Sequence, residues 1–413
     1  MAEIEKPVTP RARETYDNLL RSAEEIFEEQ GFYRSSVAEI CRKADVSNGT
    51  FYRYFTDKSD IFVRLAEGLG GDLTREIKGN FLDSKLPFND RLKLLLQTYF
   101  SFLNDNSSLY QIFRQAEFVN WDTHQAFYTE LTDTLAKGLN QGNENRYFRD
   151  HDPIVMAHYL LGTLSFVSMR WIIWDQTGLD KKIIDSLLDF LKQGLEREDD
   201  KSLDRPYYTP NESVSWDNSV LLLQKNEMSN TKTRLLAAAE SSFGQNGFYG
   251  TTVGDITREA EVAQGTFYHH FSSKLEVFET LVHEINELWR REVRARVGGL
   301  DNRREIELEG FRVFFTFIAR HSSMYRIVRE AEFVDRSLGR WYYESFAGSY
   351  KKALAQSMDE GEIRNLHPEV LAYSLMGIGH FLGQKWFVQE EREEIPSTEF
   401  ESMFDLILKG MKL

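Results

Sequence analysis

A short segment at residues 47–55 carries side chains that can form hydrogen bonds from one face of a helix. Phe51 and Phe55 are four residues apart and therefore lie on the same, opposite face of the helix, which is predicted to be buried. The free face holds small, hydroxyl, aromatic and cationic groups, namely Gly49, Thr50, Tyr52 and Arg53. Such groups allow close approach to base edges in the major groove of DNA and hydrogen bonding with them. The segment therefore favours nucleic-acid recognition.

The same segment occurs a second time. Residues 31–63 align without a gap to residues 247–279, and fifteen of the 33 positions are identical. The likeness continues in YQIFRQAEFV at 110–119 and YRIVREAEFV at 325–334, and in the spacing of Gly162 to Trp171 and of Gly377 to Trp386. A period of this length matches a complete domain pair and far exceeds the 20–50 residues of stacked repeats. The chain therefore contains one unit twice, called copy 1 and copy 2 below.

Three helices are expected to position each segment. The first has an apolar face that ends at a glycine, with Tyr16, Leu19, Leu20, Ala23 and Phe27 before Gly31, and Leu235, Leu236, Ala239 and Phe243 before Gly247. The second begins at a capping box, formed by Ser36 with Glu39 or by Thr252 with Asp255. The segment itself forms the third helix, and together the three helices predict a helix-turn-helix head in each copy.

A fourth helix follows each segment and begins at Asp57 or at Ser273. Lys58 and Lys274 then fall in its first turn, where the helix dipole disfavours a cation. A phosphate that bridges the ammonium group and the free backbone amides would remove this conflict. Both lysines are therefore predicted to hold a DNA phosphate.

These segments resemble the DNA-binding heads of the tetracycline-repressor (TetR) family. Those heads typically read V-S-x-G-T-F-Y-x-Y-F with a Lys soon after, and this chain has VSNGTFYRYFTDK at 46–58 and VAQGTFYHHFSSK at 262–274. The resemblance covers each head fully and implies subunits of nine or so helices. Asp45 and Glu261 stand where the family usually has Gly, and Ala263 replaces the usual Ser.

The resemblance also implies which residues meet DNA. In copy 1 the predicted base contacts are Asn48, Gly49, Thr50 and Arg53, the predicted phosphate contacts are Ser36, Tyr52, Tyr54 and Lys58, and Ser47 completes the interface. In copy 2 the predicted base contacts are Gln264, Gly265, Thr266 and His269, and the predicted phosphate contacts are Thr252, Tyr268, His270 and Lys274. The alternative is a helical bundle in which the Tyr and Lys side chains are ordinary surface residues. Two copies in register argue against that alternative.

Composition sets the fold class and the compartment. The chain has 413 residues, of which 41% are hydrophobic and only 8 are Pro, which favours long helices in at least two cores. A formal net charge of −15 confines any DNA contact to a small local surface. The single cysteine, Cys41, and the absence of a signal-peptide pattern predict a cytoplasmic protein. The apolar stretch at 159–174 is too short to span a membrane.

We therefore predict an all-α fold with two tandem TetR-like units. Each unit has a helix-turn-helix head followed by a helical ligand-binding and dimerisation domain. The predicted ranges are 12–60 and 61–197 for copy 1, 198–230 for a polar linker, and 231–276 and 277–413 for copy 2. TetR-like subunits pair through their last two helices into a four-helix bundle. With both partners on one chain, an intrachain pseudo-dimer is expected, and further homodimerisation stays open.

The second domains are rich in aromatic residues. Family resemblance suggests that some of these line a cavity for a hydrophobic or aromatic effector, whereas helical spacing alone predicts only that they form core and favours core for any single residue. The candidates for the ligand site are Phe113, Arg114, Phe118, Trp121, Phe166, Arg170 and Trp171 in copy 1 and Arg329, Phe333, Phe381 and Trp386 in copy 2. Arg114 and Arg329 each have a Glu three residues later, so each can form an ion pair within its helix or anchor an anionic ligand.

The predicted function is a repressor that binds operator DNA, an imperfect palindrome, and leaves it when a largely apolar small molecule binds. In a second reading, only one head contacts DNA and the other is structural or binds a partner. An enzyme with a helical scaffold is the third reading. It lacks a nucleophile motif, a glycine-rich phosphate loop or metal-ligand spacing among the histidines, so no catalytic residue, cofactor or metal is predicted.

Overall fold

The computed structural model describes residues 8–144, 151–195 and 230–412. This part of the chain is helical and contains no β-strand, which confirms the predicted fold class. The predicted linker lies outside the described residues except for Asn230. The helices of copy 1 are α1 (Pro10–Arg34), α2 (Val37–Lys43), α3 (Asn48–Tyr54), α4 (Lys58–Ile77), α5 (Phe88–Asp105), α6 (Ser107–Arg114), α7 (Ala116–Val119), α8 (Trp121–Glu144), α9 (Pro153–Ser168) and α10 (Lys181–Leu195).

Copy 2 repeats this order with one difference, since a single helix replaces α6 and α7. Its helices are α11 (Thr231–Gly250), α12 (Val253–Glu259), α13 (Gln264–His270), α14 (Lys274–Val297), α15 (Arg303–Arg320), α16 (Ser322–Val334), α17 (Arg336–Asp359), α18 (Pro368–Gly383) and α19 (Ser397–Met411). Within the described ranges, short π-helical segments interrupt or extend these helices at η1 (Lys78–Leu82), η2 (Met169–Trp174) and η5 (Gln384–Gln389).

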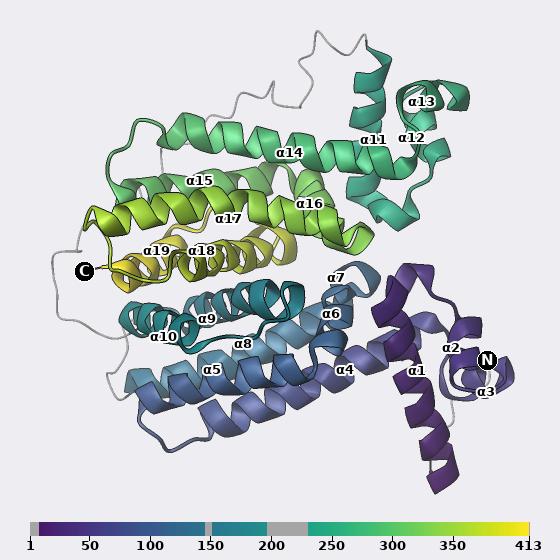
Figure 1. Ribbon diagram of the computed structural model, residues 1–413, viewed down its shortest axis with the longest axis horizontal. Coiled ribbons are helices and arrows are strands. Elements are labelled where there is room, and N and C mark those ends of the chain that lie inside the picture. Colours follow the sequence, from purple (N-terminus) through teal and green to yellow (C-terminus); the bar gives the residue numbers. More distant parts are fainter. Residues whose placement is uncertain (1–7, 145–150, 196–229, 413) are drawn as a thin grey trace. The chain divides into compact units, whose positions relative to one another are not determined.

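The chain packs as two compact units whose limits differ from those of the copies. Unit 1 holds the described residues of 1–142 and 168–179, and unit 2 holds those of 143–167 and 180–413. In each unit the head helices gather at the start of one long helix, α1–α3 at α4 and α11–α13 at α14 (Figure 1). Most of α9 and all of α10 therefore pack with the helices of copy 2.

The helical backbone of the first helix of each head stops at the predicted glycine, where the chain turns sharply. Gly31 and Gly247 adopt φ values of 78° and 72°, a conformation that glycine adopts without strain. One further turn follows each glycine, to Arg34 and to Gly250. This added turn joins the head to the rest of its copy, as described below.

Four helices from the two copies pair within unit 2. Helix α10 packs along α19, and α9 crosses α18 so closely that a Cβ atom on Gly162 or Gly377 would overlap the carbonyl oxygen of the other glycine. At the other end, the Cβ position of Gly194 lies 2.7 Å from the Leu406 carbonyl oxygen, and that of Gly410 lies 2.8 Å from the Phe190 carbonyl oxygen. These reciprocal contacts confirm the predicted intrachain pairing of the last two helices.

Polar contacts also cross this interface. Nε2 of His151 lies 2.8 Å from the Asp405 carboxylate, and Arg364 forms an ion pair with Asp189 at 2.9 Å. Both contacts join a residue of copy 1 to a residue of copy 2 and add to the pairing of the last helices.

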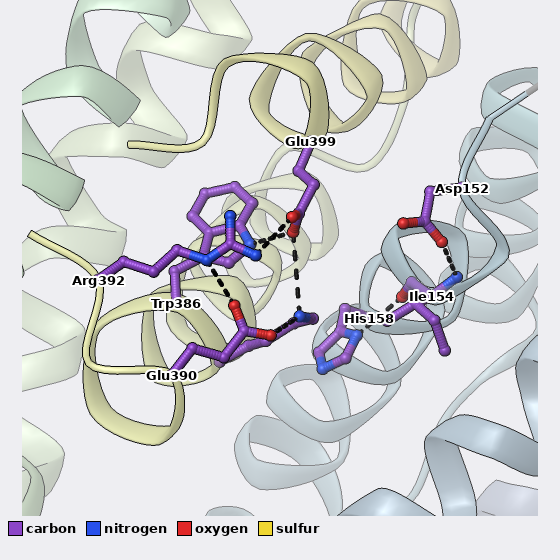
Figure 2. Close-up of polar contacts among 8 residues, drawn as sticks. Asp152, Ile154, His158, Trp386, Glu390, Arg392 and Glu399 are labelled. Carbon is purple, nitrogen blue, oxygen red and sulfur yellow. Dashed lines mark hydrogen bonds and ion pairs between the residues drawn. The ribbon is translucent and has the colours of Figure 1, made fainter. Parts of the chain in front are cut away.

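Next to the glycine crossing, His158 of α9 faces a charged cluster on copy 2 (Figure 2). The indole Nε1 of Trp386 donates to Glu399 at 2.6 Å, and Arg392 reaches both Glu399, at 2.8 Å, and Glu390, at 2.6 Å. Lys385 also contacts Glu390 and lies 3.9 Å from Glu399. His158 itself takes no part in these ion pairs, and its Nδ1 bonds the Ile154 carbonyl oxygen at 2.8 Å.

Acid should weaken this pairing through His158. Burial, aided by the nearby Lys385, lowers the pKa of His158 from 6.5 to about 4, with Glu390 and Glu399 opposing the shift. The unfolded chain therefore takes up a proton first, so stability is full above pH 6.5 and is lost as the pH falls from 6.5 towards 4, by on the order of 3 kcal/mol. Urea titrations at pH 7.5 and pH 5 should show about 2 kcal/mol of this loss, because pH 5 lies between the two pKa values. His158→Phe should reduce the loss, and an unchanged pH dependence in that variant would remove His158 from the account.

Candidate nucleic-acid interface

The helix α3 exposes most of the face that the sequence analysis assigned to DNA. Asn48, Gly49 and Arg53 are exposed and Tyr52 is 50% exposed, while Phe51 is fully buried beneath them. Ser47 caps the helix by accepting a hydrogen bond from the Thr50 backbone N–H at 3.2 Å. The cap holds Ser47 and Thr50 at the helix start, a position from which recognition helices contact bases and phosphates.

The helix α13 presents the matching face in copy 2. Gln264, Gly265 and His269 are exposed, and Tyr268 is 56% exposed. Ala263 offers no side-chain cap, which leaves the α13 N-terminus short of a contribution of about 0.5–2 kcal/mol. One helix earlier, Thr252 forms a complete capping box with Asp255.

The two glycines of these helices have no internal packing role. A Cβ atom on Gly265 would meet nothing within 4 Å, and one on Gly49 would meet only the Ser47 hydroxyl at 3.6 Å. Alanine would favour each helix by up to about 1 kcal/mol. Close approach of DNA to these two glycines therefore stays a prediction, and packing within the protein gives no other reason for them.

Tyr54 lies differently from its predicted role. Its side chain is only 6% exposed, and its ring packs edge to face on Tyr16 with centroids 6.0 Å apart. The ring therefore belongs to the core of the head, because Tyr54 follows the buried side of α3 rather than the exposed side. His270 at the matching position is half-buried. Ser36 and Thr252 are exposed, and Thr50 and Thr266 are half-buried.

Lys58 and Lys274 have internal partners that the sequence did not reveal. The Lys58 ammonium donates to the carbonyl oxygens of Phe32 at 2.5 Å and Ser35 at 2.7 Å, and it lies 4.3 Å from the centre of the Phe32 ring. Lys274 repeats this arrangement with Phe248 and Thr251, both at 2.6 Å. Burial lowers the pKa of both lysines. These carbonyl oxygens compensate the cation at each helix start. The unfavourable helix dipole is therefore no longer a reason for phosphate contact by the lysines, which stays a prediction.

Substituting these lysines should therefore destabilise the heads. In Lys58→Met and Lys274→Met the carbonyl oxygens lose a charged donor, at a cost of about 1–3 kcal/mol each. Thermal unfolding of the full chain followed by circular dichroism measures this cost. The salt dependence of operator binding in the same variants tests the phosphate contact separately, because one lost phosphate contact lowers the slope by about one. An unchanged unfolding midpoint would mean that the carbonyl contacts contribute little.

The turn between α2 and α3 is held from the first helix of each head. Asp45 and Glu261 adopt left-handed φ values of 53° and 52°, which cost a non-glycine residue roughly 1–2 kcal/mol. Asn18 secures the turn in copy 1 by donating to the Ala44 carbonyl oxygen at 2.8 Å. Arg234 does so in copy 2 by donating to the carbonyl oxygens of Ala260 and Glu261. The departure from the usual Gly is thus accommodated within each head.

Each head is fastened to its regulatory helices at the turn after the glycine kink. The backbone N–H of Phe32 donates to the Gln115 side chain at 3.1 Å, and that of Phe248 donates to the Glu330 carboxylate at 3.0 Å. Tyr33 adds a hydrogen bond to the Phe118 carbonyl oxygen at 2.6 Å. Sequence reasoning missed Gln115 and Glu330. The signal was present, because both lie at the same position of the similar blocks YQIFRQAEFV and YRIVREAEFV.

The candidate ligand residues of copy 1 lie in and around an aromatic core. Phe113 is fully buried, and its ring stands 4.3 Å from that of Phe127. Arg114 contacts the Met169 sulfur at 3.1 Å, and Arg170 forms an ion pair with Asp175. Trp121 and Phe118 are half-buried, and Trp171 is buried. An open polar hollow lies elsewhere on this unit, between α4 and α5, and none of the candidates lines it.

The candidates of copy 2 lie in three separate places. Phe166 of copy 1 and Phe381 both contact the His380 ring, with centroids 5.1 Å and 5.6 Å away. Arg329 is buried nearby, with its guanidinium 4.5 Å from the centre of the Tyr325 ring, whose hydroxyl bonds His380 at 2.8 Å. Trp386 belongs instead to the charged cluster of Figure 2. Phe333 is half-buried at the junction with the head.

His124 is a further polar residue of this region that sequence reasoning did not single out. Its ring is 5% exposed, and neither ring nitrogen has a hydrogen-bond partner among the described residues. Burial lowers the pKa of His124 to about 3, so the imidazole is neutral at pH 7. An unsatisfied buried polar group costs about 1–3 kcal/mol. The only signal in the sequence is that copy 2 has Gly339 at the matching position.

The described residues contain no cluster that indicates a metal centre, and none of their helices is long and apolar enough to span a membrane. What they contain twice is a helix-turn-helix head joined to a helical regulatory domain, the architecture of a one-component transcriptional regulator. The family model described as bacterial regulatory proteins, tetR family, matches at residues 19–65 and again at 235–281. The chain belongs to this family and contains two of its units in tandem.

Relatives of this chain include proteins named as regulators of metabolism or of transcription. A fatty acid metabolism regulator protein of Bacillus subtilis (strain 168) is 24% identical over 192 residues, which are 44% of this chain and 96% of that protein. The uncharacterized HTH-type transcriptional regulator YdgC of the same strain is 26% identical over 182 residues, 42% of this chain and 91% of that protein. A whole relative thus corresponds to about half of this chain.

Among solved structures, the fatty acid degradation regulator FadR from Bacillus halodurans matches with 23% identity. The match covers 46% of this chain and 100% of that chain, with a TM-score of 0.41.

Proposed function

We propose that this protein is a repressor in which the two heads of one chain read the two halves of one operator, and that a small molecule bound in the regulatory part releases it. The proposal rests on one observation above all. Two heads with exposed recognition helices stand on a single chain, and the last helices of the two copies pair within unit 2. In a family that acts as pairs of subunits, this chain carries its own partner.

The proposed working parts follow the repeat. The heads are 12–60 and 231–276, the regulatory domains are 61–197 and 277–413, and 198–230 connects the copies. We assign base reading to Asn48, Gly49, Thr50 and Arg53 in the first head and to Gln264, Gly265, Thr266 and His269 in the second. We assign phosphate contacts to Ser36, Ser47 and Tyr52 and to Thr252 and Tyr268, which lie on or beside the exposed faces.

The two recognition faces differ, and their operator should differ accordingly. Arg53 bonds guanine with two hydrogen bonds at a position where copy 2 has His269, and Asn48 corresponds to Gln264. The preferred operator is therefore an imperfect palindrome. Selection of binding sites from a random DNA library tests this point, and recovery of perfect palindromes would count against two different readers. Recovery of one half-site alone would favour the alternative in which a single head binds DNA, for which the uncapped α13 is the specific reason.

Release of the protein from DNA requires an effector that binds the DNA-free arrangement more tightly than the DNA-bound arrangement. The aromatic cores and the relative named for fatty acid metabolism support a largely apolar effector. The junctions at Gln115 and Glu330 provide the route to the heads, because they fasten the turn after each glycine kink. Isothermal titration with and without operator tests this part, since a true effector binds less tightly when operator is present.

A further inference from the structure

The two regulatory domains differ at one helix contact. In copy 2, Gly339 of α17 packs directly against the backbone of Glu332 in α16, so closely that a Cβ atom would overlap it. The matching residue of copy 1 is His124, and no side chain of that size fits such a contact. Copy 1 accordingly has two short helices, α6 and α7, broken at Gln115, where copy 2 has the continuous α16.

The imidazole of His124 lies in an aromatic enclosure. The ring of Trp121 stacks on it with centroids 5.4 Å apart, the ring of Tyr128 meets it edge to face at 4.8 Å, and that of Phe113 lies 6.4 Å away. In copy 2 the positions of Phe113 and Trp121 are Val328 and Arg336, so the enclosure has no equivalent there. Only Tyr128 is retained, as Tyr343.

Both nitrogens of His124 are buried and without a partner among the described residues. A neutral imidazole carries one donor and one acceptor, and folded proteins rarely leave either unused in an apolar core. The surrounding rings cannot supply these bonds, whereas an uncharged polar group on an apolar molecule can. The neighbouring Arg114 is engaged with Met169, and within the described part of the chain no carboxylate bonds the imidazole.

We propose that the chain has one effector site, in copy 1, where His124 hydrogen-bonds an uncharged carbonyl or hydroxyl group on an aromatic or aliphatic molecule that the rings of Phe113, Trp121 and Tyr128 enclose. Copy 2 serves as the structural partner and binds no effector there. This inference rests on the proposed function, because a ligand bound near Gln115 regulates DNA binding only if the first head binds the operator.

Nile red is a suitable probe because it is uncharged, aromatic and carries a carbonyl group. Titrated into the full-length protein, the dye should bind with a stoichiometry of one per chain. His124→Phe keeps an aromatic ring of similar size but removes the hydrogen-bonding atoms, and it should weaken dye binding at least tenfold. The matched control is Val328→Ala in copy 2, which changes the core of the other regulatory domain and should leave dye affinity within twofold. Two dyes per chain, no dye binding, or equal affinity in His124→Phe would overturn the inference.

Stability separates a binding residue from a structural one. Because His124→Phe removes two unsatisfied buried atoms, the variant without ligand should unfold at a higher temperature, by about 2 °C or more. A lower unfolding temperature would mean that His124 supports the fold, and the proposed site would fail. Operator binding of the ligand-free protein is measured in parallel. If the protein without substitutions does not bind the operator, the proposed repressor function is refuted, but the dye result is unaffected. The two failures are therefore distinguishable.

Discussion

Gly377→Val should lower the affinity for the operator by about a hundredfold or more while both heads remain folded. A Cβ atom at position 377 would overlap the Gly162 carbonyl oxygen, so α9 and α18 must separate. Pairing within the chain makes the second head bind at a high effective concentration, an effect that typically contributes roughly 10²- to 10⁴-fold. Once the helices separate, the heads stay on one chain but lose the pairing, so the second head should lose most of this advantage. Gel-shift titration at constant salt measures the loss.

A second glycine of unit 2 provides the control for this experiment. Gly348 lies on α17, is exposed, and a Cβ there would meet nothing within 4 Å. Gly348→Val should leave operator affinity within about twofold, because valine and glycine have similar helix propensities. If Gly377→Val binds as tightly as Gly348→Val, the paired helices do not organise the heads, and the pseudo-dimer has no role in DNA binding.

Arg53→Ala and His269→Ala should each weaken binding at one half of the operator only. A good pair of hydrogen bonds to a base is worth about 1–3 kcal/mol, so the loss in Arg53→Ala should be roughly 5- to 150-fold at the half-site that head 1 reads. His269→Ala should act on the other half-site and less strongly, since His forms fewer bonds to guanine than Arg. Binding to operators with one half-site scrambled assigns each head to its sequence.

Arg75→Ala controls for the loss of a positive charge. Arg75 is exposed on α4, forms an ion pair with Asp72 at 2.7 Å, and lies near the opposite end of that helix from the head. Its removal should change affinity little at either half-site. If Arg53→Ala weakens binding equally to every sequence, the residue contacts phosphates and does not read bases.

Much of the fold could be predicted because the heads follow simple periodic patterns. Phe51 and Phe55 are fully buried, as their four-residue spacing indicated, and Tyr52 and Arg53 are exposed. The spacing from Gly162 to Trp171 marked a feature common to both copies. It could not reveal that Gly162 meets Gly377, because contacts between distant segments leave no local pattern.

The roles of single polar residues were harder to predict. The helix dipole does disfavour a cation at Lys58, but that reasoning considered only the helix that carries the lysine. The carbonyl oxygens of Phe32 and Ser35 belong to another part of the head, beyond the bend at Gly31, and they satisfy the ammonium group. Tyr54 was placed by analogy on phosphate although its spacing from Phe51 puts it on the buried side of α3. The role of Tyr54 follows from its residue type and its position around the helix, whereas the role of Lys58 depends on neighbours from another part of the head.

The most direct test of the central claim is the mass of the complex formed with one operator. Size-exclusion chromatography with light scattering, or native mass spectrometry, gives the number of 48.2 kDa chains on a duplex that contains a single selected site. One chain per operator, with both half-sites protected in a footprint, is the predicted result. Two chains on one operator would contradict it, because each chain would then use only one head and pairing would occur between chains.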